Sequence, residues 1–468
     1  MTQAPTNLLE APPHEKAGPA RSRANGSANK LCAEDRPAHQ WYRFVLSFPP
    51  HLVRDYLKRF GIRNGQTVLD PFCGTGTTLV ECKKLGLTSV GLEANPMACF
   101  ASQVKLDWGA DPARLARHAA SVAEAVEHTL KAEGLDEEMP LWQPGYRRRG
   151  FPSGLRKLPE EAEELLLTGS ISPVPLHKTL VLLDELKRRE DGRFTKHEKL
   201  ALGSALVTRI GNLEFGPEVG VGRAKADAPV VAAWLANVRQ MAEDLRSLQA
   251  FAHVPSVVHQ ADARSPLEAL KPNTVSAVLT SPPYPNEKDY TRTTRLESVL
   301  LGFIHNKAEL RAFKRTLMRS NTRNVYKGDS DDAWVSQHPA IERIAEQIEA
   351  RRIALGKTSG FERLYARVTK LYFGGMARHL AELRAVLRPG AQLAYVVGDQ
   401  ASYLRVMIRT GQLLADIAQA LGYELLGIDL FRTRLATATK EQLREEVVLL
   451  RWPGRESEVG KGRRSRKG

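Results

Sequence analysis

The sequence is poor in cysteine and has no long uninterrupted apolar stretch. Its four cysteines show no C-x-x-C spacing and no nearby histidines of the kind that complete a zinc site. We therefore predict small buried thiols in a reducing cytoplasm, with no disulfide framework and no metal site. No apolar run approaches the roughly 20 residues that span a bilayer, and the amino terminus lacks the pattern of a secretory signal. The cysteines are Cys32, Cys73, Cys82 and Cys99.

Acidic residues are also few relative to basic residues. The 468 residues carry 68 Lys and Arg against 53 Asp and Glu, a formal net charge of +15. An excess of this size favours a polyanionic partner, although charge alone does not separate nucleic acid from a membrane surface. The hydrophobic fraction of 42% is enough for a sizeable core, and the length allows one large domain or two to three ordinary ones.

Residues 68–96 read VLDPFCGTGTTLVECKKLGLTSVGLEANP and predict a strand, a glycine turn, a helix and a second strand. The first strand ends at Asp70, and Gly74 and Gly76 allow a sharp turn with close approach of a ligand to the backbone. The helix runs from about residue 77 to 85, before Gly86, because glycine tolerates the left-handed cap conformation. Glu93 follows the second strand, where a carboxylate can accept hydrogen bonds from ribose hydroxyls.

The turn lacks the features that hold phosphates. Gly74-Thr75-Gly76 is not followed by the third glycine of the dinucleotide fingerprint. No Gly-Lys-Ser/Thr follows either, which excludes a P-loop. A nucleoside cofactor without phosphates therefore fits this stretch better.

Two further strands are predicted at residues 254–259 and 275–279. Asp262 follows the first, and the second runs directly into Thr280-Ser281-Pro282-Pro283-Tyr284. Ligands of open parallel sheets collect outside the carboxyl ends of the strands. The pattern therefore predicts that these side chains gather at one sheet edge with those that end the first two strands.

Together, DPFCGTGTT and TSPPY resemble the cofactor loop and the catalytic motif of the amino-group DNA methyltransferases. The resemblance covers about residues 44–106 and 253–452. It implies an α/β fold with a Rossmann-like mixed seven-stranded sheet. The implied cofactor is S-adenosylmethionine, and the implied partner is double-stranded DNA. A cognate restriction enzyme is a candidate second partner. It places Asp262 beside the adenine, and Phe48, Pro49 and Pro50 by position near the methionine end. The implied cofactor residues are Asp70, Phe72, Gly74, Gly76, Thr77, Glu93 and Asp262.

The implied catalytic residues are Ser281, Pro282, Pro283 and Tyr284. The lone pair of an exocyclic amine is delocalised into the base, so acceptors aimed at the amine hydrogens help the nitrogen to attack. The Ser281 hydroxyl and a proline carbonyl can accept in this way, since proline fixes φ and has no competing N–H. Tyr284 offers a face for a base turned out of the helix. No Pro-Cys nucleophile is present, which argues against ring-carbon methylation.

The serine that opens this motif is similar to the cytosine-N4 branch of the family, so we favour cytosine N4 over adenine N6. Two alternatives stay open. One is an RNA methyltransferase of the tRNA guanine type, because similar motifs occur there. The other is a non-enzymatic nucleic-acid-binding protein on a degenerate methyltransferase scaffold.

We predict four regions. Residues 1–38 form a flexible tail, 39–108 and 252–453 form the methyltransferase domain, 109–251 form a helical insertion with a candidate role in nucleic-acid recognition, and 454–468 form a basic tail. Basic residues among aromatics at 139–157, and a dense basic run at 307–327, are candidate phosphate contacts. A solvated loop and a solvated helix face are the alternative interpretations. The candidate contacts are Arg147, Arg148, Arg149, Arg315, Arg319 and Arg323.

Overall fold

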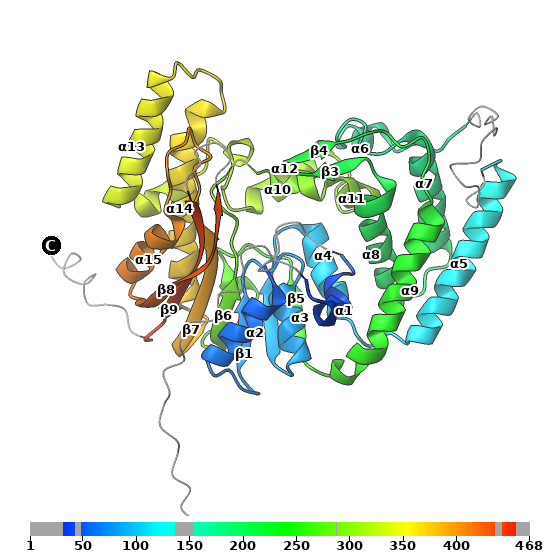
Figure 1. Ribbon diagram of the computed structural model, residues 1–468, viewed down its shortest axis with the longest axis horizontal. Coiled ribbons are helices and arrows are strands. Elements are labelled where there is room, and N and C mark those ends of the chain that lie inside the picture. Colours follow the sequence, from blue (N-terminus) through cyan, green and yellow to red (C-terminus); the bar gives the residue numbers. More distant parts are fainter. Residues whose placement is uncertain are drawn as a thin grey trace, which may run out of the picture.

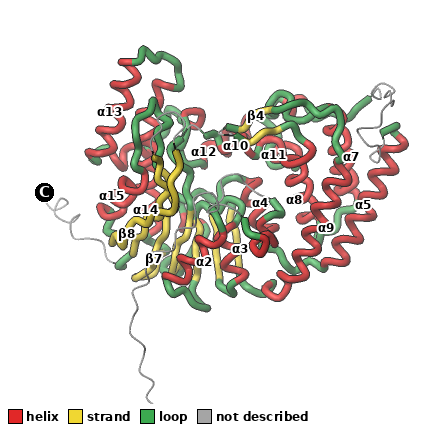
Figure 2. Tube along the Cα trace, viewed as in Figure 1, coloured by secondary structure: helices red, strands yellow, loops and turns green. Residues whose placement is uncertain are grey.

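The computed structural model describes residues 31–42, 48–135, 154–216, 218–286, 288–435 and 442–454. Its centre is a seven-stranded sheet with the strand order β5-β2-β1-β6-β7-β9-β8 (Figures 1 and 2). The strands are β1 (Thr67–Asp70), β2 (Thr88–Leu92), β5 (Ser256–His259), β6 (Val275–Thr280), β7 (Leu387–Gly398), β8 (Glu424–Leu435) and β9 (Gln442–Arg451).

The first five strands of the sheet in chain order, β1, β2, β5, β6 and β7, are parallel, and β9 runs antiparallel between β7 and β8. The chain begins at the middle of the sheet and winds outward in both directions, as in doubly wound nucleotide-binding folds. The predicted mixed seven-stranded fold is confirmed. Its parallel strands end at one edge, where the predicted site residues were expected.

Helices cover both faces of the sheet and form a bundle beside it (Figure 1). Those that follow or flank the strands are α2 (Pro50–Arg59), α3 (Thr77–Lys84), α4 (Pro96–Lys105), α10 (Tyr290–Thr293), α11 (Arg295–Leu300), α12 (Lys307–Thr316), α13 (Pro339–Ala354), α14 (Tyr365–Leu383) and α15 (Thr410–Ala420). Those of the proposed insertion are α5 (Pro112–Ala132), α6 (Glu160–Glu163), α7 (Pro173–Arg188), α8 (Thr195–Ala205) and α9 (Val230–Leu248).

The bundle shares its hydrophobic core with the sheet domain. Leu79 of α3 and Met97 of α4 belong to the same buried cluster as Leu115 of α5 and Trp234 of α9. Burying apolar surface across this junction fixes the bundle against the α4 side of the sheet. The region 109–251 therefore has no separate core of its own, and we retain its limits as a proposal.

The packed chain starts earlier than we predicted. Residues 33–39 form η1 (Ala33–Asp35) and α1 (Arg36–His39), and Ala38 is fully buried. Asp35 accepts a hydrogen bond from Arg54 at 2.7 Å. The predicted tail thus cannot extend to residue 38, because residues 33–38 are tied to α2 and α3 by buried contacts.

Several elements were not predicted. Residues 209–230 contain a hairpin of β3 (Leu213–Phe215) and β4 (Val219–Val221), and neither this hairpin nor α13 was expected. Within the described ranges, no helix combines the length and apolar character needed to cross a bilayer.

Gly374 in α14 offers a test of how this fold is packed. A Cβ at Gly374 would lie 1.9 Å from the backbone oxygen of Asp331. Alanine normally stabilises an exposed helix relative to glycine, but here the clash falls on backbone. We expect Gly374→Ala to lower the free energy of unfolding by about 1–3 kcal/mol, measured by urea denaturation. Gly360→Ala, where the added atom meets nothing within 4 Å, is the control; equal stabilities of the two variants would contradict this packing.

Candidate active site

The two sequence motifs meet in a cavity of about 660 Å³ at the carboxyl edge of the sheet. All four predicted catalytic residues line it, at the end of β6. Five of the predicted cofactor residues line it as well, namely Phe72, Gly74, Thr77, Glu93 and Asp262. Phe48, proposed by position alone, is also on the wall, whereas Pro49 and Pro50 are not among the lining residues.

The glycine turn is held by the carboxylate that ends β2. The Gly74 N–H donates to Glu93 Oε2 at 2.8 Å, and the Asn95 N–H donates to Oε1 at 2.7 Å. Gly74 has φ of +52°, and a Cβ added there would meet no atom within 4 Å, so its backbone faces open space. Burial raises the pKa of Glu93 to about 7, and these backbone N–H groups oppose that rise.

Gly76 has a different role from the one we predicted. Its φ is +85°, and a Cβ there would lie 2.8 Å from Ser102 Oγ of α4. Glycine at this position therefore lets the start of α3 pack closely against α4. Gly76 shapes the turn from behind and is not among the residues that line the cavity.

Asp70 lies beneath the turn and connects the two motifs. Its carboxylate is 1% exposed and accepts hydrogen bonds from Thr78 Oγ1 at 2.7 Å and Thr280 Oγ1 at 2.6 Å. Thr78 belongs to α3, and Thr280 directly precedes the catalytic motif. Desolvation raises the pKa of Asp70 to about 6, although these hydrogen bonds favour the charged form. Asp70 thus supports the site and does not line it.

The catalytic motif is packed against the end of β7. Ser281 Oγ donates to the Val396 carbonyl at 3.1 Å and is also hydrogen-bonded to the Tyr284 side chain, so its oxygen keeps one lone pair for a further donor. The Tyr284 ring lies beside Gly398, where a Cβ would come within 3.0 Å of Tyr284 Cε2. Burial raises the pKa of the Tyr284 hydroxyl above its ordinary value. The tyrosine is therefore neutral.

Beside Tyr284, the cavity has charged residues that sequence reasoning missed. Lys288 follows the catalytic motif, and Arg432 and Arg434 lie two residues apart on β8. Glu445 of β9 pairs with Arg432 at 2.5 Å and with Arg434 at 3.6 Å. The two-residue spacing places both arginines on one face of the strand, a signal that was present in the sequence.

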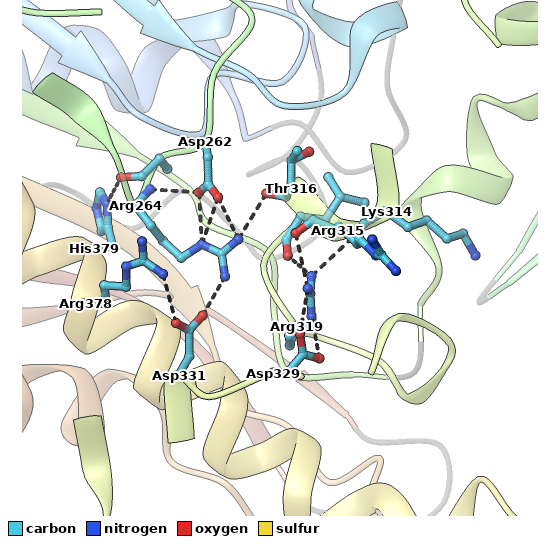
Figure 3. A network of polar contacts seen from close by, with 12 residues as sticks. Asp262, Arg264, Lys314, Arg315, Thr316, Arg319, Asp329, Asp331, Arg378 and His379 are labelled. Carbon is cyan, nitrogen blue, oxygen red and sulfur yellow. Dashed lines mark hydrogen bonds and ion pairs between the residues drawn. The ribbon is translucent and has the colours of Figure 1, made fainter. Parts of the chain in front are cut away.

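The predicted nucleic-acid contacts divide into two groups. Arg319 is 4% exposed and forms paired hydrogen bonds with Asp329, both at 2.9 Å (Figure 3). It is an internal structural residue, so we withdraw it as a phosphate contact. Arg315 and Arg323 are exposed and lie over the rings of Tyr326 and Phe361. Arg147, Arg148 and Arg149 lie outside the described residues.

The sheet order, the nucleoside-type turn and the proline-rich strand end define a Rossmann-like methyltransferase. Residues 20–103 match the model of the N6/N4 DNA methylase family. The Type II methyltransferase M.BsoBI of Geobacillus stearothermophilus is 26% identical over 451 residues, covering 89% of this chain and 85% of the relative. M.AvaI of Nostoc sp. is 21% identical over 464 residues, covering 90% and 87%. The chain is therefore similar to Type II methyltransferases over most of its length, and to the DNA methylase family in residues 20–103.

A shorter similarity extends to an enzyme named for RNA. The tRNA (guanine(10)-N2)-dimethyltransferase of Methanothermobacter thermautotrophicus is 36% identical over 58 residues, which cover 12% of this chain and 17% of that relative. Such a short match does not carry over to the remainder of the chain.

The raised pKa of Asp70 predicts how the free energy of unfolding depends on pH. Its pKa is higher in the folded protein, about 6, than the ordinary 3.8, so the folded state holds the proton more tightly. Its contribution to stability is full below about pH 4 and is lost as the pH rises through 6. The loss amounts to about 3 kcal/mol. We expect Asp70→Asn to reduce this slope in urea denaturation between pH 4 and 7, with the remainder due to groups such as Glu93 whose pKa is also raised. Parallel curves for the two proteins would contradict the assignment.

Proposed function

We propose that the protein is a site-specific DNA methyltransferase that moves a methyl group from S-adenosylmethionine to an exocyclic amino nitrogen, with cytosine N4 favoured over adenine N6. The observation that supports it best is the meeting of the glycine turn, Glu93 and the Ser281–Tyr284 strand end in one cavity. The substrate that we propose is double-stranded DNA. A cognate restriction enzyme is a further proposed partner, because the relatives above are named Type II methyltransferases.

The residues at one end of the cavity fit the donor. Open space above Gly74 admits a nucleoside, Glu93 is placed for ribose hydroxyls, and Asp262 for the adenine amine. The ring of Phe72 forms part of the same wall and is held by an edge contact with His379, with ring centroids 4.9 Å apart. When bound, S-adenosylmethionine supplies an electrophilic methyl group on sulfur.

The residues at the end of β6 act on the target amine. Ser281 accepts one amine hydrogen while its own proton is held by the Val396 carbonyl. A carbonyl of Pro282 or Pro283 accepts the other hydrogen, and these acceptors favour attack as charge develops on nitrogen. The Tyr284 ring supports the extruded base, so the chain contributes mainly by positioning.

The basic residues at and near the cavity favour a polyanionic substrate. Lys288, Arg432 and Arg434 lie at the cavity, and the exposed Arg315 and Arg323 lie on the segment that follows α10 and α11. These cations can contact the phosphates beside an extruded nucleotide. Glu218 reaches the cavity from the proposed insertion and pairs with Arg323 at 3.7 Å.

The decisive experiment is sequencing of DNA from cells that express the protein, read for N4-methylcytosine and N6-methyladenine. Transfer of tritiated methyl groups to duplex DNA, compared with bulk tRNA, tests the RNA alternative that the short match favours. Transfer to tRNA alone would overturn the proposal. The scaffold alternative would stand if wild type binds DNA without methylating it and Ser281→Ala/Tyr284→Ala binds equally well.

Removing the Ser281 hydroxyl should slow methyl transfer. We expect Ser281→Ala to lower kcat by roughly 10²–10³-fold, because one preorganised acceptor is lost at the attacking nitrogen, while donor binding stays unchanged. The measurement is single-turnover transfer to duplex DNA. Ser276→Ala is the matched control on the same strand, since Ser276 is not among the residues that line the cavity. Equal rates for the two variants would refute the role of Ser281.

The two exposed arginines should contribute to DNA affinity through phosphate. We expect Arg315→Ala to weaken binding similarly for all sequences and to reduce the slope of log K against log[salt] by about 1. Fluorescence anisotropy across a salt series measures both quantities. Arg246→Ala, on the bundle helix α9, serves as the control and should leave the slope unchanged. An unchanged slope for Arg315→Ala would remove that residue from the interface.

A further inference from the structure

A buried arginine connects the proposed cofactor end of the cavity with the neighbouring wall. Arg264 is 6% exposed and donates from Nη2 to Asp262 Oδ2 at 2.6 Å and from Nη1 to Asp331 Oδ2 at 2.5 Å (Figure 3). Its Nη2 also lies 3.4 Å from the Thr316 carbonyl. One guanidinium therefore joins the loop after β5, the end of α12 and the start of η6 (Asp331–Val335).

Both sides of this connection belong to the cavity. Asp262 lines the end assigned to the adenine, and Thr316, Leu317 and Met318 line the wall beside it. Between Thr316 and Asp331, the chain is held a second time by the pair of Arg319 with Asp329 (Figure 3). The segment 316–331 is thus held in place by internal ion pairs, and Arg264 connects it to Asp262.

The geometry requires an arginine. The Nε of Arg264 approaches both oxygens of Asp262, at 3.0 and 3.1 Å, so the carboxylate meets a planar fork. A lysine ammonium cannot reproduce this fork and reach Asp331 as well. Asp262 Oδ1 also accepts from the backbone N–H of Arg264 at 2.9 Å, so donors of one residue hold the carboxylate, while 24% of its side-chain surface stays exposed. Its orientation toward the cavity is then set by Arg264.

Charge keeps the arrangement together. Arg264 lies between two carboxylates, and Asp331 has a second partner in Arg378 at 3.3 Å. Loss of one partner from a buried pair leaves an uncompensated charge, so neither Asp262 nor Asp331 can leave Arg264 without a penalty. The two walls are therefore positioned by one shared group.

We propose that Arg264 is a positioning residue of the methyl-transfer site, which orients Asp262 for the adenine amine and, through Asp331, sets the wall that faces the target nucleotide. The proposal rests on the function proposed above. It assigns different roles to the two carboxylates, since Asp262 serves the donor and Asp331 serves the substrate side.

The test compares Arg264→Lys and Asp331→Asn with Arg352→Gln. Arg352 is a matched control, because it also forms a two-bond pair with a carboxylate, that of Glu349, at 2.8 and 2.6 Å, but is not among the residues that line the cavity. Donor-site affinity is measured by calorimetric titration with S-adenosylhomocysteine. The kcat and KM for duplex DNA are measured at saturating donor.

We expect Arg264→Lys to weaken S-adenosylhomocysteine binding about tenfold and to lower kcat/KM for DNA as well. Asp331→Asn should lower kcat/KM for DNA about tenfold and leave S-adenosylhomocysteine affinity within about twofold. The control should match wild type in both measurements. A purely structural role would not separate the two measurements in this way.

The outcomes are distinct. If wild type neither binds S-adenosylhomocysteine nor methylates DNA, the proposed function fails. If wild type does both, the positioning role is overturned when Arg264→Lys equals wild type, or when Asp331→Asn weakens both measurements to the same extent. If Arg264→Lys does not fold, Asp331→Asn decides alone, and its agreement with the control would overturn the proposal.

Discussion

The hydrogen bonds of the Asp70 carboxylate are the interaction on which the site depends. They join the end of β1 to Thr78 in α3 and to Thr280 at the end of β6. These two elements come from motifs some 200 residues apart in the chain. The parallel sheet brings the strand ends to one edge. The hydrogen bonds of Asp70 then fix the positions of α3 and the end of β6 relative to each other, and methyl transfer depends on such accurate positioning. A buried carboxylate is costly, so its retention at 1% exposure fits a positioning role.

The same principle recurs on the opposite side of the cavity. Arg264 and Arg319 are buried cations, each surrounded by carboxylate and carbonyl oxygens (Figure 3). Their pairs brace the segment 316–331 from within, while the exposed Arg323 lies on its outer surface. Basic residues in one short run thus divide into structural braces and candidate phosphate contacts.

Much of the architecture could be predicted because the relevant signals are local. The strand–turn–helix unit at residues 68–85 is identified by a strand that ends in Asp-Pro-Phe, a glycine turn and a periodic helix. The other predicted motif is identified by the apolar strand that precedes Ser-Pro-Pro-Tyr. The hairpin of β3 and β4 was missed because it lies in a glycine-rich loop. In α13 the buried residues Ile341, Ala345 and Ile348 follow the helical spacing, so this signal was present in the sequence. The packed residues 33–38 were missed because their contacts lie with residues distant in the sequence, such as the contact of Asp35 with Arg54.

By itself, the sequence predicted the strand–turn–helix–strand unit at residues 68–96 and the apolar strand before Ser-Pro-Pro-Tyr, since each follows from residue types at short spacing. Only the tertiary structure decided which polar groups face the cavity. Gly76 packs behind the turn, Asp70 lies beneath it, and Arg319 is enclosed by its own segment. The physical reason is that the burial of a side chain and its hydrogen-bond partners depend on elements far apart in the chain. Burial and partners together decide whether a charged side chain supports the fold or contacts a ligand.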